Sequence, residues 1–150
     1  LPTLDRTKYA SAKGVEQGGY VLADCDGEPE VILIATGSEV HPCLEAHDTL
    51  AADGIRSRVV SLPCWTLFER QSDKYRASVL PPTIRARVCV EQAATFGWER
   101  YSGLDGEIIG MTRFGASAPI AELQREFGFE PENIVAAARR TIDRVAGASS

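Results

Sequence analysis

The chain has 150 residues, which is enough for one domain with its own core, and its 44% hydrophobic and 25% charged residues are ordinary for a globular protein. The formal net charge is −5 and no basic stripe is present, which argues against nucleic acid and anionic membrane surfaces as partners. No apolar run reaches the roughly 18 residues of a membrane-spanning helix, so we expect no membrane partner.

Residues 1–18 are mostly polar and show no apolar period, so we interpret them as a linker or an extension from a preceding domain. A short strand is predicted over 20–24. Asp26-Gly27 follows it, and Asp-Gly between two apolar runs is a strong hairpin signal. We therefore expect this first strand to pair antiparallel with a second strand at 31–35.

The stretch 31–35 is continuously apolar, which predicts a strand buried on both faces of a sheet. Gly37 then leads into apolar residues at helical spacing from Val40 onward. Ser38 is the predicted N-cap of this helix, because its hydroxyl can accept a hydrogen bond from a free backbone N–H of the first turn. Asp53-Gly54 is predicted to end the helix, with the glycine in the left-handed conformation.

The rest of the chain alternates strands with helices. Strands are predicted at 58–62, 86–91 and 107–111, and helices at 65–68, 73–80, 93–101, 118–127 and from Pro131 onward. Helical connections between such strands favour parallel pairing with right-handed crossovers. We therefore expect an α/β fold, a three-layer αβα domain with a mixed, mostly parallel five-stranded sheet and one antiparallel strand. Its centre is predicted at 31–35, 59–62 and 88–90.

The cysteines and histidines form no recognisable metal or redox motif. No two cysteines lie within four residues of each other, so the sequence has neither a zinc knuckle nor a C-x-x-C pair. His41 and His47 are about 240° apart on a helix, too far to share a metal, and are interpreted as structural or surface residues. We expect buried or half-buried thiols in a reducing, cytoplasmic compartment, at Cys25, Cys43, Cys64 and Cys89.

Familiar cofactor and nucleophile motifs are absent from the sequence. The turn T-G-S has one glycine where a dinucleotide-binding fingerprint has three, and neither a P-loop nor G-x-S-x-G occurs. These absences argue against NAD, against a P-loop nucleotide site and against the nucleophile elbow of α/β hydrolases.

Two places at the predicted carboxyl edge of the sheet are candidate ligand or interface sites. At Gly37-Ser38-Glu39 a helix N-terminus offers free N–H groups to an anion. Glu39 argues against an anion because its carboxylate already answers the helix dipole, and a Ser38 cap followed by a first-turn acid explains the same residues. Glu91, with Gln92, ends a predicted strand where α/β sheets bind ligands, and an interface contact is the alternative.

Five segments, taken in chain order, resemble the carboxy-terminal domain of transketolases. Each is short, but the ordered set covers nearly the whole chain and is highly specific. The last segment points away from the related domains of deoxyxylulose phosphate synthase and of 2-oxo acid dehydrogenase β subunits. Pro42, Cys64 and Trp65 depart from the residues usual in the family. The segments are G-G-Y-V-L-A-D (18–24), I-A-T-G-S-E-V (34–40), R-V-V-S-L-P (58–63), Y-R-A-S-V-L-P (75–81) and G-M-T-R-F-G-A-S-A-P (110–119).

The resemblance implies a linker over 1–18 and a transketolase carboxy-terminal domain over 19–150. Transketolases are dimeric thiamine diphosphate enzymes of the pentose phosphate and Calvin pathways, and they transfer a two-carbon ketol unit between sugar phosphates. Their cofactor and its divalent metal, magnesium or calcium, lie between the two other domains of the enzyme. The resemblance therefore implies no catalytic, cofactor-binding or metal-binding residue in this chain.

The third domain of the family helps to form the homodimer, which implies a non-catalytic assembly role for this chain. Two alternatives are a regulatory small-molecule site at Gly37-Ser38-Glu39 and Glu91, and the equivalent domain of a related thiamine diphosphate enzyme. An assembly domain should expose apolar area that its neighbours cover. We expect Phe96, Trp98 and Phe114, in loops or helix starts at the carboxyl edge, to face the preceding domains or a second subunit.

Overall fold

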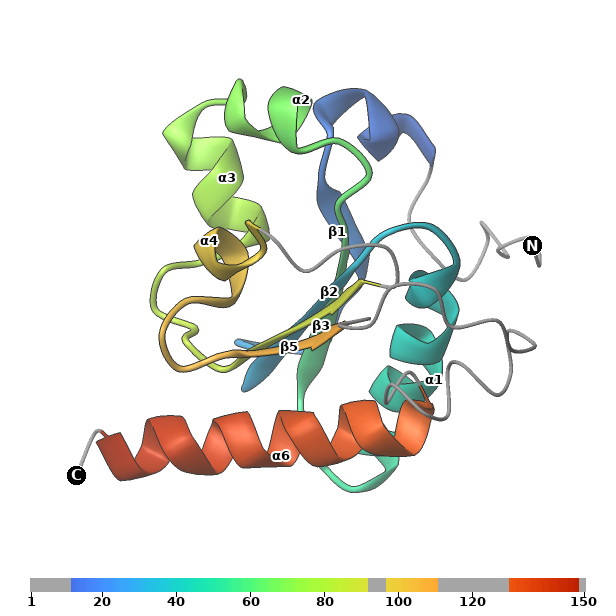
Figure 1. Cartoon of the computed structure of the whole chain (residues 1–150), viewed down its shortest axis with the longest axis vertical. Helices are drawn as coiled ribbons and strands as arrows, with labels where there is room; N and C mark the ends of the chain where they lie inside the picture. Colours follow the sequence, from blue (N-terminus) through green and yellow to red (C-terminus); the bar gives the residue numbers. More distant parts are fainter. Residues whose placement is uncertain (1–11, 92–96, 111–129, 149–150) are drawn as a thin grey trace.

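A computed structural model describes residues 12–91, 97–110 and 130–148 (Figure 1). The strands are β1 (Tyr20–Ala23), β2 (Val31–Ala35), β3 (Ser57–Ser61), β4 (Arg87–Glu91) and β5 (Glu107–Gly110). The α-helices are α1 (Val40–Ala52), α2 (Trp65–Glu69), α3 (Asp73–Val79), α4 (Glu99–Ser102) and α6 (Pro131–Ala148). Two 3-10 helices, η1 (Ala12–Gln17) and η2 (Gly37–Glu39), complete the described elements.

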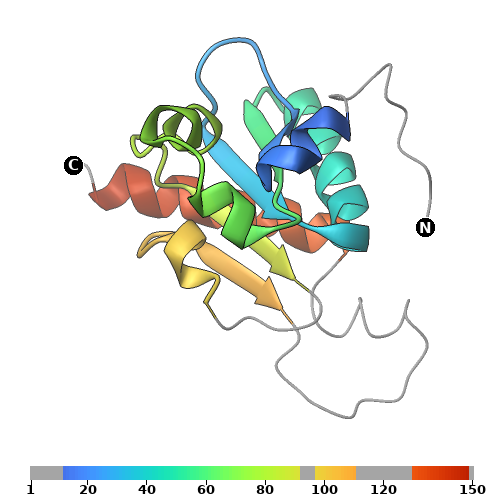
Figure 2. The ribbon, with the colours of Figure 1, turned by 90° about the horizontal axis from the view of Figure 1, so that it is seen from above.

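The five strands form one sheet in the order β1-β3-β2-β4-β5, with helices on both of its faces (Figures 1 and 2). Successive residues of a strand point to opposite faces, so Leu33 joins the core under α1 and α6, whereas Ile32 joins the core under α2, α3 and α4. β1 is antiparallel to its neighbour, and the other strands pair in parallel. The predicted three-layer α/β class, with one antiparallel strand, is confirmed.

β2 is the centre of the sheet. All five of its residues are fully buried, and it pairs in parallel with β3 on one side and with β4 on the other. Leu33 lies beside Val59 of β3 and Val88 of β4. A strand covered by helices on both faces has no polar side, which explains why its sequence is apolar without alternation. The predicted central strands are therefore confirmed.

The predicted partner of the first strand is wrong. β1 pairs antiparallel with β3, not with β2, and Tyr20 lies beside Ser61. Both sides of β2 are paired with parallel strands, so β1 cannot pair with β2 and lies on the outer side of β3. The Asp26-Gly27 turn, with Gly27 at a φ of +82°, belongs to a longer connection between an edge strand and the central strand.

Two predicted helix starts also need correction. α1 begins at Val40 with Glu39 in the N-cap position, so Ser38 lies in η2 and is not the cap. Of the helix predicted over 93–101, residues 93–96 lie outside the described residues, and α4 begins at Glu99, because Gly97 has a φ of +88° that no α-helix accommodates. The predicted helix 118–127 lies outside the described residues. Within the described ranges, no helix combines the length and the apolar character needed to span a bilayer.

Candidate functional site

The strand order creates a topological switch point between β2 and β4. From β2 the chain runs through α1 to β3 on one side, whereas from β4 it runs through α4 to β5 on the other side. Ala35 lies beside Val90, so the carboxyl ends of the two strands meet at one edge. Ligands of open α/β sheets bind at such a point. The structure therefore brings Gly37–Glu39 and Glu91, the two predicted places, to the same edge of the sheet.

Gly37 is required at this turn for its backbone conformation. Its φ of +61° lies in the left-handed region, which side chains with a Cβ adopt only with strain. A Cβ built on Gly37 would meet Glu39 Oε2 at 3.6 Å, an ordinary contact. Glycine is therefore selected here by the turn that joins β2 to η2 and not by a lack of space.

Glu39 is a buried carboxylate at the start of α1. Glu39 is 5% exposed, and its carboxylate does not cap the helix by a hydrogen bond to the free N–H groups of the first turn. Negative charge is nevertheless favourable there, because it faces the positive end of the helix dipole. The same charge repels a second anion at close range. The geometry therefore opposes an anionic ligand at this turn.

The thiols near the centre of the fold are poor nucleophiles. Burial raises the pKa of Cys43 strongly, and the neighbouring Glu39 carboxylate raises it further. Burial likewise raises the pKa of the Cys89 thiol. Both groups therefore remain protonated thiols at neutral pH, and the thiolate is the reactive form. All four cysteines are free and are buried or half-buried, as predicted.

His47 forms a structural pair with Ser57. His47 Nδ1 lies 2.6 Å from the hydroxyl oxygen of Ser57, a distance typical of a nucleophile and its base. Ser57 is 1% exposed, however, so its hydroxyl is closed to a substrate and the pair is structural. Across the described parts of the chain, no three His, Cys, Asp or Glu side chains come close enough to hold a metal ion.

The predicted interface role of Trp98 is wrong. Trp98 is 2% exposed and packs edge-on against Trp65, with the two ring centroids 4.9 Å apart. Gly97 allows this inward direction, because its positive φ turns the chain immediately before Trp98. Phe96 and Phe114, the other two predicted interface residues, lie outside the described residues.

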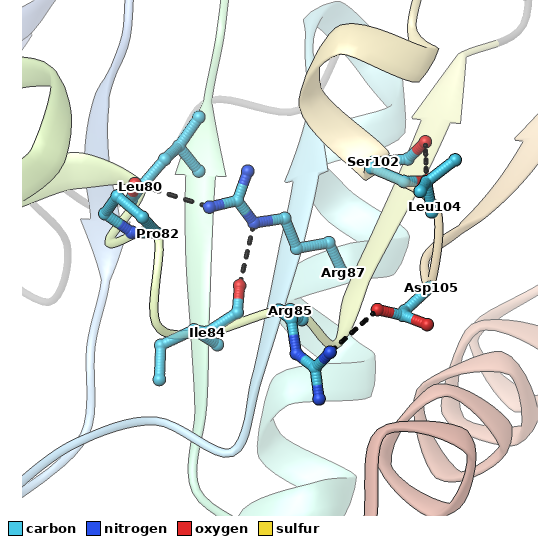
Figure 3. A pocket seen from close by; sticks show the side chains of 9 residues that line it. Leu80, Pro82, Ile84, Arg85, Arg87, Ser102, Leu104 and Asp105 are labelled. Atoms are coloured by element: carbon cyan, nitrogen blue, oxygen red, sulfur yellow. Dashed lines mark hydrogen bonds and ion pairs between the residues drawn. The ribbon is translucent and has the colours of Figure 1, made fainter. Parts of the chain in front are cut away.

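A pocket of about 520 Å³ lies at the opposite, amino-terminal edge of the sheet (Figure 3). Arg87 crosses it and donates hydrogen bonds to the backbone oxygens of Ile84 and Tyr101, both at 2.9 Å, and of Pro81 at 3.0 Å. Arg85 pairs with Asp105 at 3.4 Å. Both arginines thus hold the fold together, and we assign this pocket no ligand. The sequence signal for this structural role is an arginine, Arg87, at the first position of the buried strand R-V-C-V.

The fold and the site together define a doubly wound α/β domain. Its switch point carries the carboxylates of Glu39 and Glu91. Comparison with known proteins then identifies the family. Residues 18–130 match the family model described as "Transketolase-like TK C-terminal domain", and the chain belongs to the transketolase family.

Known relatives agree with this family. A transketolase of Aquifex aeolicus is 48% identical over 134 residues, which cover 89% of this chain and 19% of that protein. A crystal structure of a Pichia stipitis transketolase in complex with sedoheptulose-7-phosphate superposes with a TM-score of 0.85 at 37% identity, over 98% of this chain and 21% of the other. A structure titled "Split gene transketolase, inactive beta4 tetramer" matches with a TM-score of 0.64 at 25% identity, over 85% of this chain and 43% of the other. The chain thus spans about a fifth of the length of the curated relatives that it matches.

Proposed function

We propose that the chain is the non-catalytic assembly domain of a transketolase, which transfers a two-carbon ketol unit between sugar phosphates with thiamine diphosphate. The observation that carries this proposal is the family match over 18–130. The Pichia stipitis relative that was solved with sedoheptulose-7-phosphate supports sugar phosphates as the substrate class. In this proposal residues 1–18 are the linker, and the longer protein is a cytoplasmic homodimer of the pentose phosphate or Calvin pathway.

The described residues do not fit thiamine diphosphate and its divalent metal. A diphosphate requires backbone N–H groups or cations that converge on it, and magnesium or calcium requires several oxygen ligands. The switch point instead places the buried carboxylate of Glu39 at the helix start, and the described residues contain no candidate metal cluster. We therefore assign the cofactor to the other domains of the longer enzyme and derive no step of the reaction from this chain.

The split-gene structure supports an inactive state for the isolated domain. That structure is described as an inactive tetramer, and this chain matches 43% of its length.

A ketol-transfer assay tests the proposal. The 150-residue chain is incubated with xylulose 5-phosphate, an aldose phosphate acceptor, thiamine diphosphate and magnesium, beside a transketolase chain that contains the same domain with its preceding domains. We expect turnover from the longer chain and none from the 150-residue chain above a protein-free control. Turnover by the 150-residue chain would overturn the non-catalytic role, and an inactive longer chain would overturn the enzyme assignment.

A regulatory ligand site is the second candidate function, because the structure brings Gly37–Glu39 and Glu91 to the switch point. Inorganic phosphate and a nucleoside triphosphate test this candidate in a thermal-shift measurement on the longer chain, against the repulsion that we expect from the Glu39 carboxylate. A saturable rise in melting temperature that Glu39→Gln alters, and Glu45→Gln on the exposed face of α1 does not, would favour regulation. A melting temperature independent of both probes would favour assembly alone.

A further inference from the structure

We propose that η1 and α2 form the docking surface for the part of a transketolase chain that precedes this domain. This η1–α2 surface consists of the exposed apolar residues Val15, Pro63 and Leu67. The inference rests on the proposed function, and it replaces the buried Trp98 as the contact between this domain and its neighbours.

Two of the three residues, Val15 and Leu67, lie next to one glycine, Gly18. Gly18 donates a hydrogen bond from its N–H to the Val15 carbonyl at 3.0 Å, and its own carbonyl accepts one from Cys64 N–H at 3.0 Å. A Cβ on Gly18 would collide with the Cys64 carbonyl and would lie 2.7 Å from Leu67 Cβ. The glycine thus lets the end of η1 lie directly on the start of α2, and the two elements stand side by side in Figures 1 and 2.

Few large hydrophobic side chains are exposed in the described parts of the chain, and two of them lie on this surface. Val15 and Leu67 are 44% and 37% exposed, and they are two of the three large hydrophobic side chains found exposed across the described ranges. The third, Leu104, lies at the rim of the pocket on the opposite edge of the sheet. Single exposed hydrophobic residues are common, so the argument depends on where these two lie.

Val15 and Leu67 lie where the chain enters the domain. The matched part is about a fifth of the relatives' length, and the family model places it at the carboxyl end. A preceding body would be connected through residues 1–11, and 11 residues span at most roughly 40 Å. A preceding body is therefore joined to the domain at η1, next to the η1–α2 surface, whereas Leu104 lines the pocket at the opposite edge of the sheet.

The surface is rigid enough to hold a docked body. The Tyr75 hydroxyl of α3 lies 2.8 Å from both Gln17 Oε1 and the Gly19 carbonyl oxygen. A Cβ on Gly19 would lie 2.5 Å from Leu62 Cδ1, so the chain that follows η1 is packed closely onto the core. η1 is therefore held to the domain by these contacts, although it falls within the predicted linker 1–18.

Side-chain footprinting with hydroxyl radicals on the longer transketolase chain tests the proposal without a substitution. Leu67 and Leu104 are exposed leucines of the same molecule, so each serves as the reference for the other. We expect oxidation of Leu67 and Val15 to be several-fold weaker, relative to Leu104, than their exposed areas in the domain require. Labelling of Leu67 in proportion to its exposed area would overturn the proposal.

Two variants of the longer chain extend the test. We expect Val15→Asp and Leu67→Asp to speed proteolytic cleavage within residues 1–11, and Leu104→Asp to leave that cleavage unchanged. Because Leu67 is the neighbour of the buried Phe68, amide exchange at β2 shows whether the Leu67→Asp variant still folds, and Val15→Asp keeps the test valid if it does not. Cleavage that is equal in all three variants would overturn the proposal.

Dilution of the protein shows whether the η1–α2 surface is covered by the same chain or by a second subunit. Protection of Leu67 that persists when the protein is diluted below its dimerisation range supports docking within one chain. Protection that is lost on dilution would assign the surface to a second subunit and overturn the proposed occupant. An active enzyme with a fully labelled Leu67 would refute only the docking surface, whereas an inactive enzyme with a protected Leu67 would refute only the proposed function.

Discussion

The two helical layers on the sheet stabilise the same strands in different ways. One layer consists of α1 and α6, which have 13 and 18 residues and contribute small and aliphatic side chains such as Leu50 and Ile134. The other consists of α2, α3 and α4, which have five, seven and four residues. Isolated helices this short do not persist in water, so the second layer depends on its tertiary contacts.

Aromatic rings supply many of those contacts. Trp65 lies with its ring centroid 4.9 Å from that of Trp98 and 5.2 Å from that of Tyr101, in edge-to-face geometries. Phe68, fully buried in α2, approaches Tyr101 in the same geometry. Such rings bury large apolar areas and add an orientation preference. A few large side chains thus replace the long apolar faces that α1 and α6 offer.

Arginines are also used differently in the two layers. Arg58 and Arg87 reach from the sheet to backbone carbonyls at the end of α3, including those of Val79 and Leu80. These are the oxygens that a short helix leaves without partners, and a cation there also complements the helix dipole. On α6, by contrast, the exposed Arg139 and Arg140 form ion pairs with carboxylates at the surface. We therefore expect α2, α3 and α4 to unfold together when one of these aromatic or arginine side chains is removed.

Removal of Trp98 should have the largest effect on this comparison. We expect Trp98→Ala to lower the free energy of unfolding by about 3–5 kcal/mol, because it leaves a cavity beside Trp65. Native-state hydrogen exchange should show faster exchange in α2, α3 and α4 while α1 stays protected. Ile134→Ala, in the aliphatic layer, is the control and should accelerate exchange throughout. Equal acceleration of exchange in both helical layers of Trp98→Ala would show that the two layers do not unfold separately.

Removal of the Arg87 guanidinium should have an intermediate effect. Arg87→Met keeps much of the aliphatic stem but removes the guanidinium donor from the carbonyls of the buried Ile84 and Tyr101. We expect a loss of about 2–3 kcal/mol in urea-induced unfolding, because buried acceptors lose their partners. Arg139→Met, which removes one exposed ion pair with Asp53, should change stability by less than about 1 kcal/mol. Similar losses in the two variants would contradict the proposed difference in arginine use.

The smallest effect is expected at Glu107, where β5 meets α6. Hydrogen bonds from Arg140, and to a lesser extent from Arg144, hold the pKa of the Glu107 carboxyl below its ordinary value, against the opposing effect of burial. A lowered pKa in the folded state adds stability above the ordinary value of 4.5, and that stability is lost as the pH falls through the folded pKa. Glu107→Gln should therefore cost about 1 kcal/mol at pH 7 and nothing in strong acid.

Thermal unfolding as a function of pH measures this effect. The difference in melting temperature between the original chain and Glu107→Gln should shrink as the pH drops below 4.5. Glu45→Gln on the exposed face of α1 should show no such dependence. A difference that is constant with pH would mean that the carboxylate charge does not hold α6 to β5.

The position of the candidate site was largely predictable, because it follows from local patterns. A buried apolar strand that runs into a glycine turn and a helix places Gly37–Glu39 at a carboxyl edge, and the same reasoning places Glu91 there. Their meeting at a switch point required the strand order, which no local pattern contains. The anchoring of η1 on α2 was also hidden, since the close approach at Gly18 becomes visible only when Cys64 is placed beside it.

The α/β class, the central strands, the left-handed Gly54 after α1 and the family could be predicted from the sequence. Each depends on residues that are neighbours in the chain or on an ordered set of short motifs. The pairing of β1 with β3 and the inward direction of Trp98 could not, because both depend on contacts between distant parts of the chain. A central strand can pair with only two neighbours, and β2 pairs with the parallel strands β3 and β4. The ring of Trp98 packs against the rings of Trp65, which comes from α2, and of Tyr101.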